Sequence, residues 1–362
     1  MGFEGTSVGL DVHARSVVAA AIDEVTGEIS RVRLVPDSAQ VLDWLGRLPG
    51  PVTVAYEAGP TGFGLYRSLT AAGIATTVAA PSKLVRPAGD RVKTDAKDAL
   101  LLARLLRMGE LVAVEVPSVS REAARDLVRA REDVRGDLMR ARHRVSKLLL
   151  RHGHVYYGGK AWTGAHHAWL RSIRLEQPGT RAALESDLEA VLFAEARRDR
   201  LGAAIEVMAA DSEFSDVTRR LFCLRGISTL TGFALAVEIG DWDRFTGSSI
   251  GAYLGLVPSE ASSGQSRRLG AITKTGNSHA RRLLVEAAWH HKPRYVVGAV
   301  LQSRWDQAPP AARARGHEGN QRLHYRWTRF GERNKKHTVA TTAVARELAG
   351  WCWSLATLTD PA

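Results

Sequence analysis

The chain has 362 residues, 45% of them hydrophobic, which suffices for more than one buried core and excludes a disordered protein. Fifty Lys and Arg residues against 38 Asp and Glu give a formal net charge of +12, which makes nucleic acid the leading candidate partner. Because the sequence has no long apolar run and no signal-peptide layout at its first residues, we expect a cytoplasmic protein without membrane spans. Because it has only two cysteines, we expect neither a disulfide framework nor a cysteine-rich zinc site.

The first third of the chain alternates between strand and helix patterns. Short segments separated by turn residues predict strands over residues 7–12, 16–23, 28–35, 51–57 and 74–80. Apolar spacings of three and four predict a helix that Ser38 caps, and further helices over residues 62–72 and 94–108. An antiparallel meander followed by alternating strands and helices is typical of a ribonuclease-H-like α/β sheet, and we expect that fold here.

The next segment has the pattern of a long helical arm. Apolar residues recur at alternating spacings of three and four from Ala124 to Leu148, interrupted once by Arg131, which predicts a coiled-coil seam. A second amphipathic helix over residues 181–210 is its expected partner. Ten Lys or Arg residues lie between Arg121 and Arg151 against five acidic residues. A solvated helix face and direct nucleic-acid contact explain this charge equally well.

The last part of the chain is predicted to be mainly helical. Helices are expected over residues 229–242 and 279–291 and at the end of the chain, where Val344, Leu348, Trp351 and Leu355 keep heptad spacing. A Gly- and Ser-rich segment over residues 246–277 separates the first two helices, and a very basic stretch over residues 311–336 precedes the last. The predicted fold class is therefore α/β plus α, with domains over residues 1–115, 116–213 and 214–362.

Four acidic residues are candidate metal ligands. Asp11 lies within an apolar strand, where a carboxylate is costly unless a cation or hydrogen-bond donors meet it. Glu57 ends a later strand, and Asp95 and Asp98 share one face of the following helix. Each of these acids is more often simply solvated, but in a ribonuclease-H-like sheet the four converge. Four carboxylates can hold two Mg²⁺ ions that assist displacement at a phosphodiester.

Several runs of sequence resemble one family. They are VGLDVH, YEAGPTGFGLYRSL, KTDAKDALLLARLL, EIGDWDRF, YLGLVPSEASSG and GAITKTGNSHARRLLVEAAW. They resemble the bridge-RNA-guided insertion-sequence transposases, which are relatives of the Piv and MooV DNA invertases. The resemblance covers nearly the whole chain, but the basic stretch over residues 311–336 is less typical and receives no role.

The resemblance implies a RuvC-like N-terminal domain and a C-terminal transposase domain with a serine nucleophile. It places the family's acidic tetrad on Asp11, Glu57, Asp95 and Asp98, with Mg²⁺, or Mn²⁺ as the alternative, as the bound metal. It places the nucleophile on Ser263 in the run Ser262-Ser263-Gly264, and Ser262 is the close alternative. It also implies donor and target DNA and an element-encoded bridge RNA as partners, and dimers that pair into a tetramer.

Basic residues near the serine run are candidates for phosphate contact. Without the resemblance, SSGQSRR is typical of a flexible loop. With it, Arg267, Arg268 and Lys274 are suited to neutralise a phosphoryl transition state. Arg281 and Arg282 near the start of the next helix are predicted to contact DNA.

Three functions remain in competition. The first is a DNA-strand-transferring recombinase guided by RNA. The second is a metal-dependent junction resolvase or nuclease, which needs the four acids but no serine. The third is a nucleic-acid-binding scaffold without catalysis. The complete tetrad argues against the scaffold, and the serine run argues against the simple nuclease.

Overall fold

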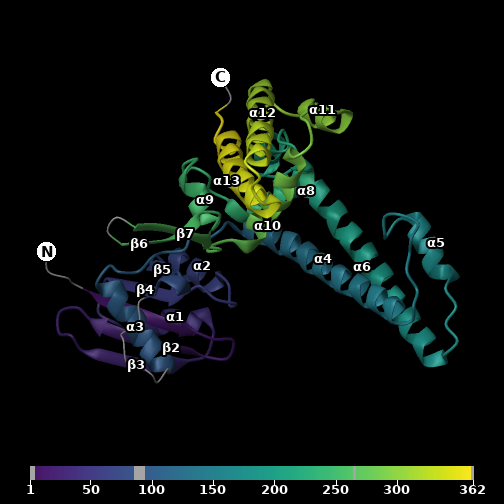
Figure 1. The fold of residues 1–362 in the computed structure, drawn as a ribbon. Coiled ribbons are helices and arrows are strands. Elements are labelled where there is room, and N and C mark those ends of the chain that lie inside the picture. The colour runs from purple at the N-terminus through teal and green to yellow at the C-terminus, as the bar shows by residue number, and fades with distance from the viewer. Residues whose placement is uncertain (1–4, 85–93, 264–265, 360–362) are drawn as a thin grey trace. The chain divides into compact units, whose positions relative to one another are not determined.

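A computed structural model describes residues 5–84, 94–263 and 266–359, which fall into two compact units, Met1–Pro117 and Ser118–Ala362 (Figure 1). Gly264 lies outside the described residues, as do the side chains of Ser263 and Arg267. The first unit is mixed α/β and the second is mostly helical, as the sequence predicts. We describe each unit by itself.

The first unit is built on a five-stranded sheet of order β3-β2-β1-β4-β5. Its strands are β1 (Thr6–Val12), β2 (Val17–Asp23), β3 (Ile29–Leu34), β4 (Val52–Glu57) and β5 (Ala75–Ala79). The first three strands are antiparallel to one another, whereas β4 and β5 run parallel to β1. All five predicted strands are confirmed, and their order is consistent with the expected RuvC-like fold.

Three helices cover the two faces of this sheet. They are α1 (Ser38–Leu45), α2 (Gly64–Ala71) and α3 (Asp95–Arg107). Along β2, Val18, Ala20 and Ile22 form a buried cluster with residues of α3, whereas the intervening residues join a cluster with α1 and α2. This alternation is the period of two that any strand imposes on its side chains. The side chain of Asp37, rather than the predicted Ser38, caps α1 by accepting a hydrogen bond from the Ala39 amide.

Helix α3 approaches β1 closely at Gly9. A Cβ atom there would overlap the carbonyl oxygen of Ala99, and it would lie 2.5 Å from the Ala103 nitrogen and 2.8 Å from the Leu102 Cβ. Only glycine therefore allows the helix backbone to rest directly on the strand. The contact fixes how the start of α3 lies against the end of β1.

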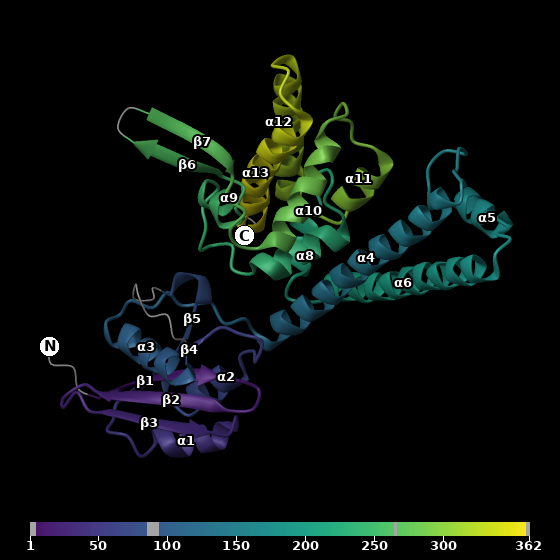
Figure 2. The same ribbon diagram turned by 60° about the horizontal axis from the view of Figure 1, so that its bottom comes forward.

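The second unit comprises a helical arm, a helical body and one β-hairpin (Figure 2). The arm contains α4 (Val119–Arg151), α5 (Gly164–Ser172) and α6 (Pro178–Ala210). The body contains α7 (Ser215–Leu221), α8 (Thr229–Ile239), α9 (Ser249–Tyr253), α10 (Ser278–Ala288), α11 (Ala299–Trp305), α12 (Pro310–Glu332) and α13 (His337–Ala356). The hairpin consists of β6 (Pro258–Ser263) and β7 (Ser266–Ile272).

Helices α4 and α6 pack along each other, and α5 lies at the far end of this arm (Figures 1 and 2). Val134, Leu138 and Val145 of the predicted seam are buried. Arg131 interrupts the buried series, as predicted, and its guanidinium lies beside Gly202 of α6. His166 of α5 is buried against the rings of Trp162 and Trp169, so these three side chains form a packing cluster.

The body has its own core, in which α13 packs on α10 and α12. Val344, Leu348 and Leu355 of α13 are fully buried, as their heptad spacing predicts. Cys223 and Cys352 are both buried, and burial raises the pKa of Cys223 to about 12, which fits reduced packing residues. Among the helices that the structure describes, none has the length and apolar character that a membrane crossing requires.

Replacing Gly9 with Ala tests the contact between α3 and β1. We expect the free energy of unfolding of the first unit to fall by about 2–3 kcal/mol, because overpacking forces the helix away from the strand. Urea unfolding of the full chain, followed by amide exchange at β1 and α3, measures the change. The matched control is Gly64→Ala, where nothing lies within 4 Å of the added Cβ. Equal stability of the two variants would disprove the tight contact.

Candidate functional site

The four predicted acidic residues lie at the α3 side of the sheet. Val8 and Leu10 of β1, and Val54 and Tyr56 of β4, belong to the cluster with α1 and α2. The period of two therefore assigns Asp11 and Glu57 to the opposite face. Leu10 pairs with Tyr56 in register, so Asp11 and Glu57 end neighbouring parallel strands. Asp95 and Asp98 lie in the first turn of the helix that covers this face.

Side-chain contacts draw part of this group together. The His13 Nε2 lies 3.1 Å from the Asp11 Oδ2 and 3.9 Å from the Asp95 Oδ1. The Arg33 Nη2 donates a hydrogen bond of 3.1 Å to the Asp95 Oδ2. Burial raises the pKa of Asp11, and the negative charges of Asp95 and Asp98 raise it further, although His13 opposes the shift. The Asp11 carboxylate is thus short of positive charge.

The donor set suits a divalent cation. Ligand atoms of Asp11, His13 and Asp95 lie within 4.8 Å of one another, the one such group found in the described part of the chain. Carboxylate oxygens suit Mg²⁺ and Mn²⁺, and a cation beside Asp11 would supply the charge that burial and its acidic neighbours make necessary. An imidazole nitrogen suits Mn²⁺ better than Mg²⁺. The residues present therefore fit a metal site.

Two members of this cluster, His13 and Arg33, were not among the predicted site residues. The signal for His13 lies in the run Asp11-Val12-His13, because residues two apart on a strand face the same side. Nothing local marks Arg33, which reaches Asp95 from β3, two strands away from β1. The contact of Arg33 with Asp95 therefore depends on the order of the strands in the sheet.

The predicted serines lie on a β-hairpin rather than in an unstructured loop. Ser262 pairs with Arg267 and Ser263 with Ser266, at the end of β6 and the start of β7. The side chain of Ser262 donates a hydrogen bond of 2.7 Å to the Glu260 Oε1. Because the segment is rich in Ser and Gly and has few β-branched residues, the sequence gives little strand signal.

The other predicted basic residues differ in how they are engaged. Arg268 is exposed on β7, and Lys274 adopts a left-handed backbone with φ of 55°. The Arg281 Nη1 donates to the carbonyl oxygens of Leu254 and Thr275, at 2.9 and 2.7 Å. Arg282 forms ion pairs with Glu132 and Glu286. Contact of these side chains with nucleic acid stays a prediction.

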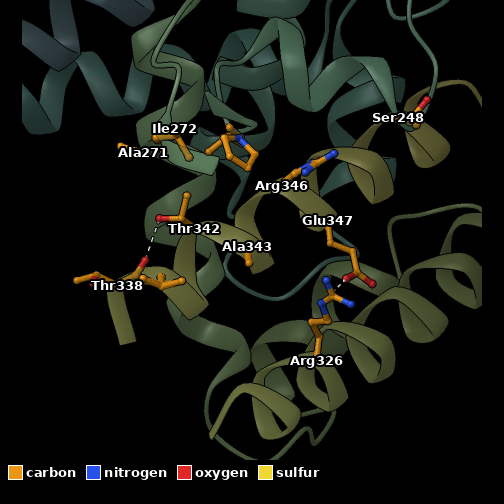
Figure 3. A pocket seen from close by; sticks show the side chains of 14 residues that line it. Ser248, Ala271, Ile272, Arg326, Thr338, Thr342, Ala343, Arg346 and Glu347 are labelled. Carbon is orange, nitrogen blue, oxygen red and sulfur yellow. Dashed lines mark hydrogen bonds and ion pairs between the residues drawn. The ribbon is translucent and has the colours of Figure 1, made fainter. Parts of the chain in front are cut away.

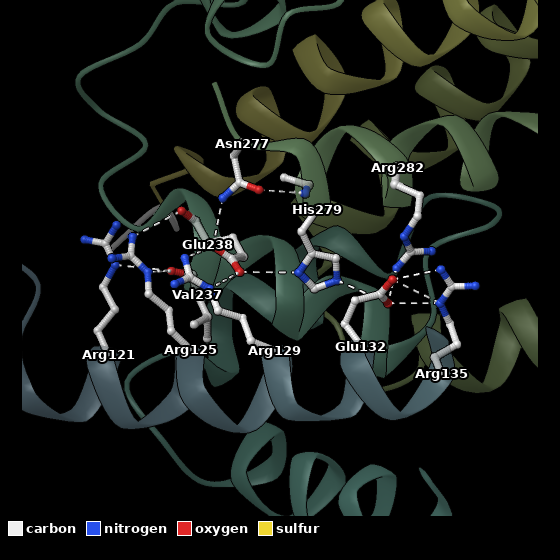
Figure 4. Close-up of polar contacts among 11 residues, drawn as sticks. Arg121, Arg125, Arg129, Glu132, Arg135, Val237, Glu238, Asn277, His279 and Arg282 are labelled. Carbon is white, nitrogen blue, oxygen red and sulfur yellow. Dashed lines mark hydrogen bonds and ion pairs between the residues drawn. The ribbon is translucent and has the colours of Figure 1, made fainter. Parts of the chain in front are cut away.

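A polar network around the buried Glu238 connects α4 of the arm to α8 and α10 (Figure 4). Glu238, with a side chain only 1% exposed, accepts two hydrogen bonds of 3.0 Å from Arg129 of α4 and one of 2.7 Å from the Asn277 side chain. The His279 Nδ1 lies 3.3 Å from Glu238, and its Nε2 lies 3.7 Å from Glu132 of α4. Asn277 also caps α10, which follows the hairpin.

The same arm helix satisfies the C-terminal carbonyls of α8. Arg121 donates to the carbonyl oxygens of Val237 and Ile239, and Arg125 donates to those of Val237 and Glu238. These carbonyls have no partner within their own helix and lie at the negative end of its dipole. Several arginines of the basic arm therefore hold the second unit together, a role that neither sequence-based interpretation included.

A cavity of about 740 Å³ lies at the foot of the hairpin (Figure 3). Pro258 of β6 and Ile272 of β7 line one part of its wall, and residues of α13 line another. Arg326 and Glu347 face each other at its edge as an ion pair, and Arg346 and Thr342 also line it. The cavity thus combines an apolar lining with several polar groups.

Comparisons with known proteins find similarity along most of the chain. Residues 8–153 match a family model for DEDD transposases of the IS110 type. Residues 218–299 match the family model described as the transposase IS116/IS110/IS902 family. Neither match includes α12 or α13.

Individual relatives extend these matches. A putative transposase, y4qE, of Sinorhizobium fredii is 40% identical over 84% of this chain and 75% of its own length. The transposase for insertion sequence element IS1533 of Leptospira borgpetersenii is 28% identical over 91% of this chain and 97% of its own length. A probable family 20 transposase of Pseudomonas aeruginosa is 30% identical over 83% of this chain and 88% of its own length.

The Glu238 network predicts a pH dependence of stability. Burial alone would raise the pKa of Glu238, but hydrogen bonds from His279, Arg129 and Asn277 outweigh it and hold the pKa below its usual range. A lowered folded-state pKa stabilises the fold above the unfolded value of about 4.3, and this stabilisation is lost as pH falls below it.

Glu238→Gln should remove this acid-sensitive contribution to stability and lower the free energy of unfolding at neutral pH by about 2–3 kcal/mol, since Arg129, Asn277 and His279 lose the charged acceptor of their hydrogen bonds. Urea unfolding of the full chain between pH 3 and pH 7 measures both effects. The control is Asp216→Asn, which removes an exposed carboxylate paired with Arg219. If Glu238→Gln and the parent lose stability equally below pH 4, Glu238 does not carry the dependence.

Proposed function

This chain belongs to the IS116/IS110/IS902 family of transposases, and we propose that it cuts and rejoins DNA through a serine nucleophile assisted by a carboxylate-bound metal site. The observation that carries the metal half is the gathering of two carboxylates and an imidazole, those of Asp11, Asp95 and His13, at one face of the sheet. Membership in the family makes DNA the substrate and transposition the reaction. The serine half rests on the resemblance of the hairpin sequence.

Asp11, Glu57, Asp95 and Asp98 are the proposed metal ligands, with Mg²⁺ as the metal and Mn²⁺ as the alternative. The bound metal would stabilise charge on the phosphodiester oxygens during displacement. Arg33 orients the Asp95 carboxylate through its hydrogen bond, and His13 holds Asp11 in place or serves as a further ligand. The close contact of α3 with β1 keeps the helical and strand ligands at a fixed separation.

Ser263 is the proposed nucleophile, and Ser262 remains the close alternative. The serine oxygen forms a bond to phosphorus while the bond from phosphorus to the departing deoxyribose oxygen breaks, and the proton that the serine hydroxyl loses ends on that departing oxygen. The resulting phosphoserine keeps the strand available for rejoining. Arg267, Arg268 and Lys274 are proposed to neutralise the transition state, and Arg281 and Arg282 to contact DNA. For the alternative nucleophile, the Ser262 hydroxyl donates a hydrogen bond to Glu260, which offers a proton acceptor for that serine.

The wider assembly is also a proposal. We infer domains over residues 1–115, 116–213 and 214–362, with the middle one a coiled-coil arm. The partners are donor and target DNA and an element-encoded bridge RNA, and the chain assembles as dimers that pair into a tetramer. The net charge of +12 supports polyanionic partners, and the sequence resemblance supports the guide RNA and the assembly.

A metal-dependent nuclease without a serine intermediate is the second candidate function. The acidic cluster favours it directly, since a metal site can place water on phosphorus without a protein nucleophile. The two candidates differ in one product. A serine recombinase leaves protein attached to a DNA end, whereas the nuclease releases both ends.

Replacing Asp11, Glu57, Asp95 or Asp98 with the matching amide tests the metal site. Each variant should keep its fold and lose strand cleavage at least about 100-fold, because the amide keeps the volume but not the charge that binds the metal. Mn²⁺ binding, measured by electron paramagnetic resonance, should weaken in parallel. Asp43→Asn, which alters an exposed acid on α1 that pairs with Arg47, is the control. Full cleavage in excess chelator would contradict the metal assignment.

Ser263→Ala tests the nucleophile. The variant should still bind DNA but should lose cleavage and the covalent protein-DNA adduct together, because only the attacking oxygen is missing. Ser262→Ala should keep substantial activity, and peptide mapping of the trapped adduct should identify Ser263. An adduct lost in Ser262→Ala but kept in Ser263→Ala would assign the neighbouring serine instead. Cleavage with unattached ends in the double variant would show that water attacks.

A further inference from the structure

The outward face of α12 carries an unusual concentration of positive charge. Between residues 313 and 336 there are eight Lys or Arg residues against two Glu. Four of these arginines recur along one face of the helix and line a hollow of about 280 Å³ together with Tyr325 and Phe330. We call this the α12 basic surface, and its arginines are Arg322, Arg326, Arg329 and Arg333.

Neighbouring acids orient the arginines without neutralising them. Arg322 and Arg326 share one carboxylate, Glu347 of α13, with distances of 2.9 and 3.3 Å from their Nε atoms. Figure 3 shows the pair of Arg326 and Glu347. Arg329 pairs with Glu332 at 2.9 Å. The side chains of Arg322 and Arg326 remain 50% and 43% exposed despite these contacts. Four arginines against two carboxylates leave an excess of positive charge.

An aromatic ring lies within this charged surface. The side chain of Tyr325 is 55% exposed, and the guanidinium carbon of Arg322 lies 6.0 Å from its ring centroid. Trp327, two residues later, is buried instead and packs beside Trp289. Burial therefore explains Trp327, whereas packing within the second unit does not explain an exposed Tyr325 between arginines. An aromatic face flanked by cations is the arrangement that binds unpaired bases.

The α12 basic surface adjoins the cavity at the foot of the serine hairpin. Arg326 lines both the smaller hollow and the larger cavity, and Glu347 lies at the edge of the latter. A chain bound along α12 would therefore lead toward Pro258 and Ile272, where the hairpin begins and ends. The separation along α12 from Arg322 to Arg333 corresponds to about 16 Å of helix, enough to follow several phosphates of a strand.

We propose that the α12 basic surface binds an unpaired nucleic-acid strand, with Tyr325 stacking on a base and Arg329 and Arg333 contacting phosphates. An unpaired strand uses both the arginines and the exposed Tyr325 ring. The bases of a duplex are already stacked on one another, and an acidic protein would need the arginines but not the ring. This proposal goes beyond the proposed function, since it assigns a binding site outside both matched family regions and holds whether serine or water attacks phosphorus.

Binding of labelled oligonucleotides to the full chain tests the proposal. Oligouridine, oligothymidine and duplex DNA of about 12 nucleotides, within the size that such sites cover, are titrated by fluorescence anisotropy. Tyr325→Ala should weaken binding of both single strands about tenfold, and Tyr325→Phe should keep most of it because the stacking face remains. Arg329→Gln with Arg333→Gln should lower the salt slope by about 1.4, since each single-strand phosphate contact contributes about 0.7. Duplex binding should change little.

The control variant combines Arg47→Gln with Arg219→Gln, which removes the same charge from two exposed ion pairs elsewhere. If the α12 variants lose affinity for oligouridine alone, the site is supported and the bound strand is RNA. If they lose affinity for oligouridine and oligothymidine equally, the site is supported and recognises a base ring and phosphates of either strand. The proposal is overturned if the α12 variants bind single strands as the control does, the result expected for a protein or membrane partner. It is also overturned if duplex binding falls as much as single-strand binding.

Discussion

The second unit depends on how the C-terminal end of α8 is satisfied. Three backbone carbonyls and the buried carboxylate of Glu238 gather there, and none of them can remain without a partner away from water. Arginines of α4 supply donors to all of them. Gly240, with φ of 74°, leaves room for the guanidinium of Arg121, where a Cβ atom would clash with it. The arginines of α4 and the carboxylate of Glu238 therefore join the arm, α8 and the start of α10 at one place.

This junction also determines how the hairpin is attached. The side-chain amide of Asn277 donates to Glu238, and its side-chain oxygen caps α10. The segment between β7 and α10 is therefore tied both to Glu238 of α8 and to the start of α10. Arg281 adds contacts to the carbonyls of Leu254 and Thr275 on either side of the hairpin. The structural use of these basic residues shows that a positive charge in the sequence does not by itself mark a nucleic-acid contact.

Much of the first unit could be predicted from sequence, because its short apolar runs are separated by turn residues. These runs predict β1 and β2, and the alternation of their residues between two buried clusters assigns Asp11 to the α3 face. His13 could have been found from its spacing to Asp11, but Arg33 could not, since its contact with Asp95 depends on sheet order. In the second unit, the hairpin has few β-branched residues and the basic stretch lacks an apolar face of clear period, so the sequence predicts neither a strand pair nor a long α12. Tertiary contacts decide both.

The hairpin has a consequence for selectivity. Most described side chains of β6 and β7 are exposed, and a two-stranded ribbon without a covering layer is only marginally stable in water. In the proposed reaction, DNA bound at the hairpin supplies interactions that the ribbon lacks by itself. Binding energy used in this way does not appear as affinity but as a faster chemical step. In the proposed reaction, a correct and an incorrect DNA can consequently bind equally well and still differ in how often they are cut.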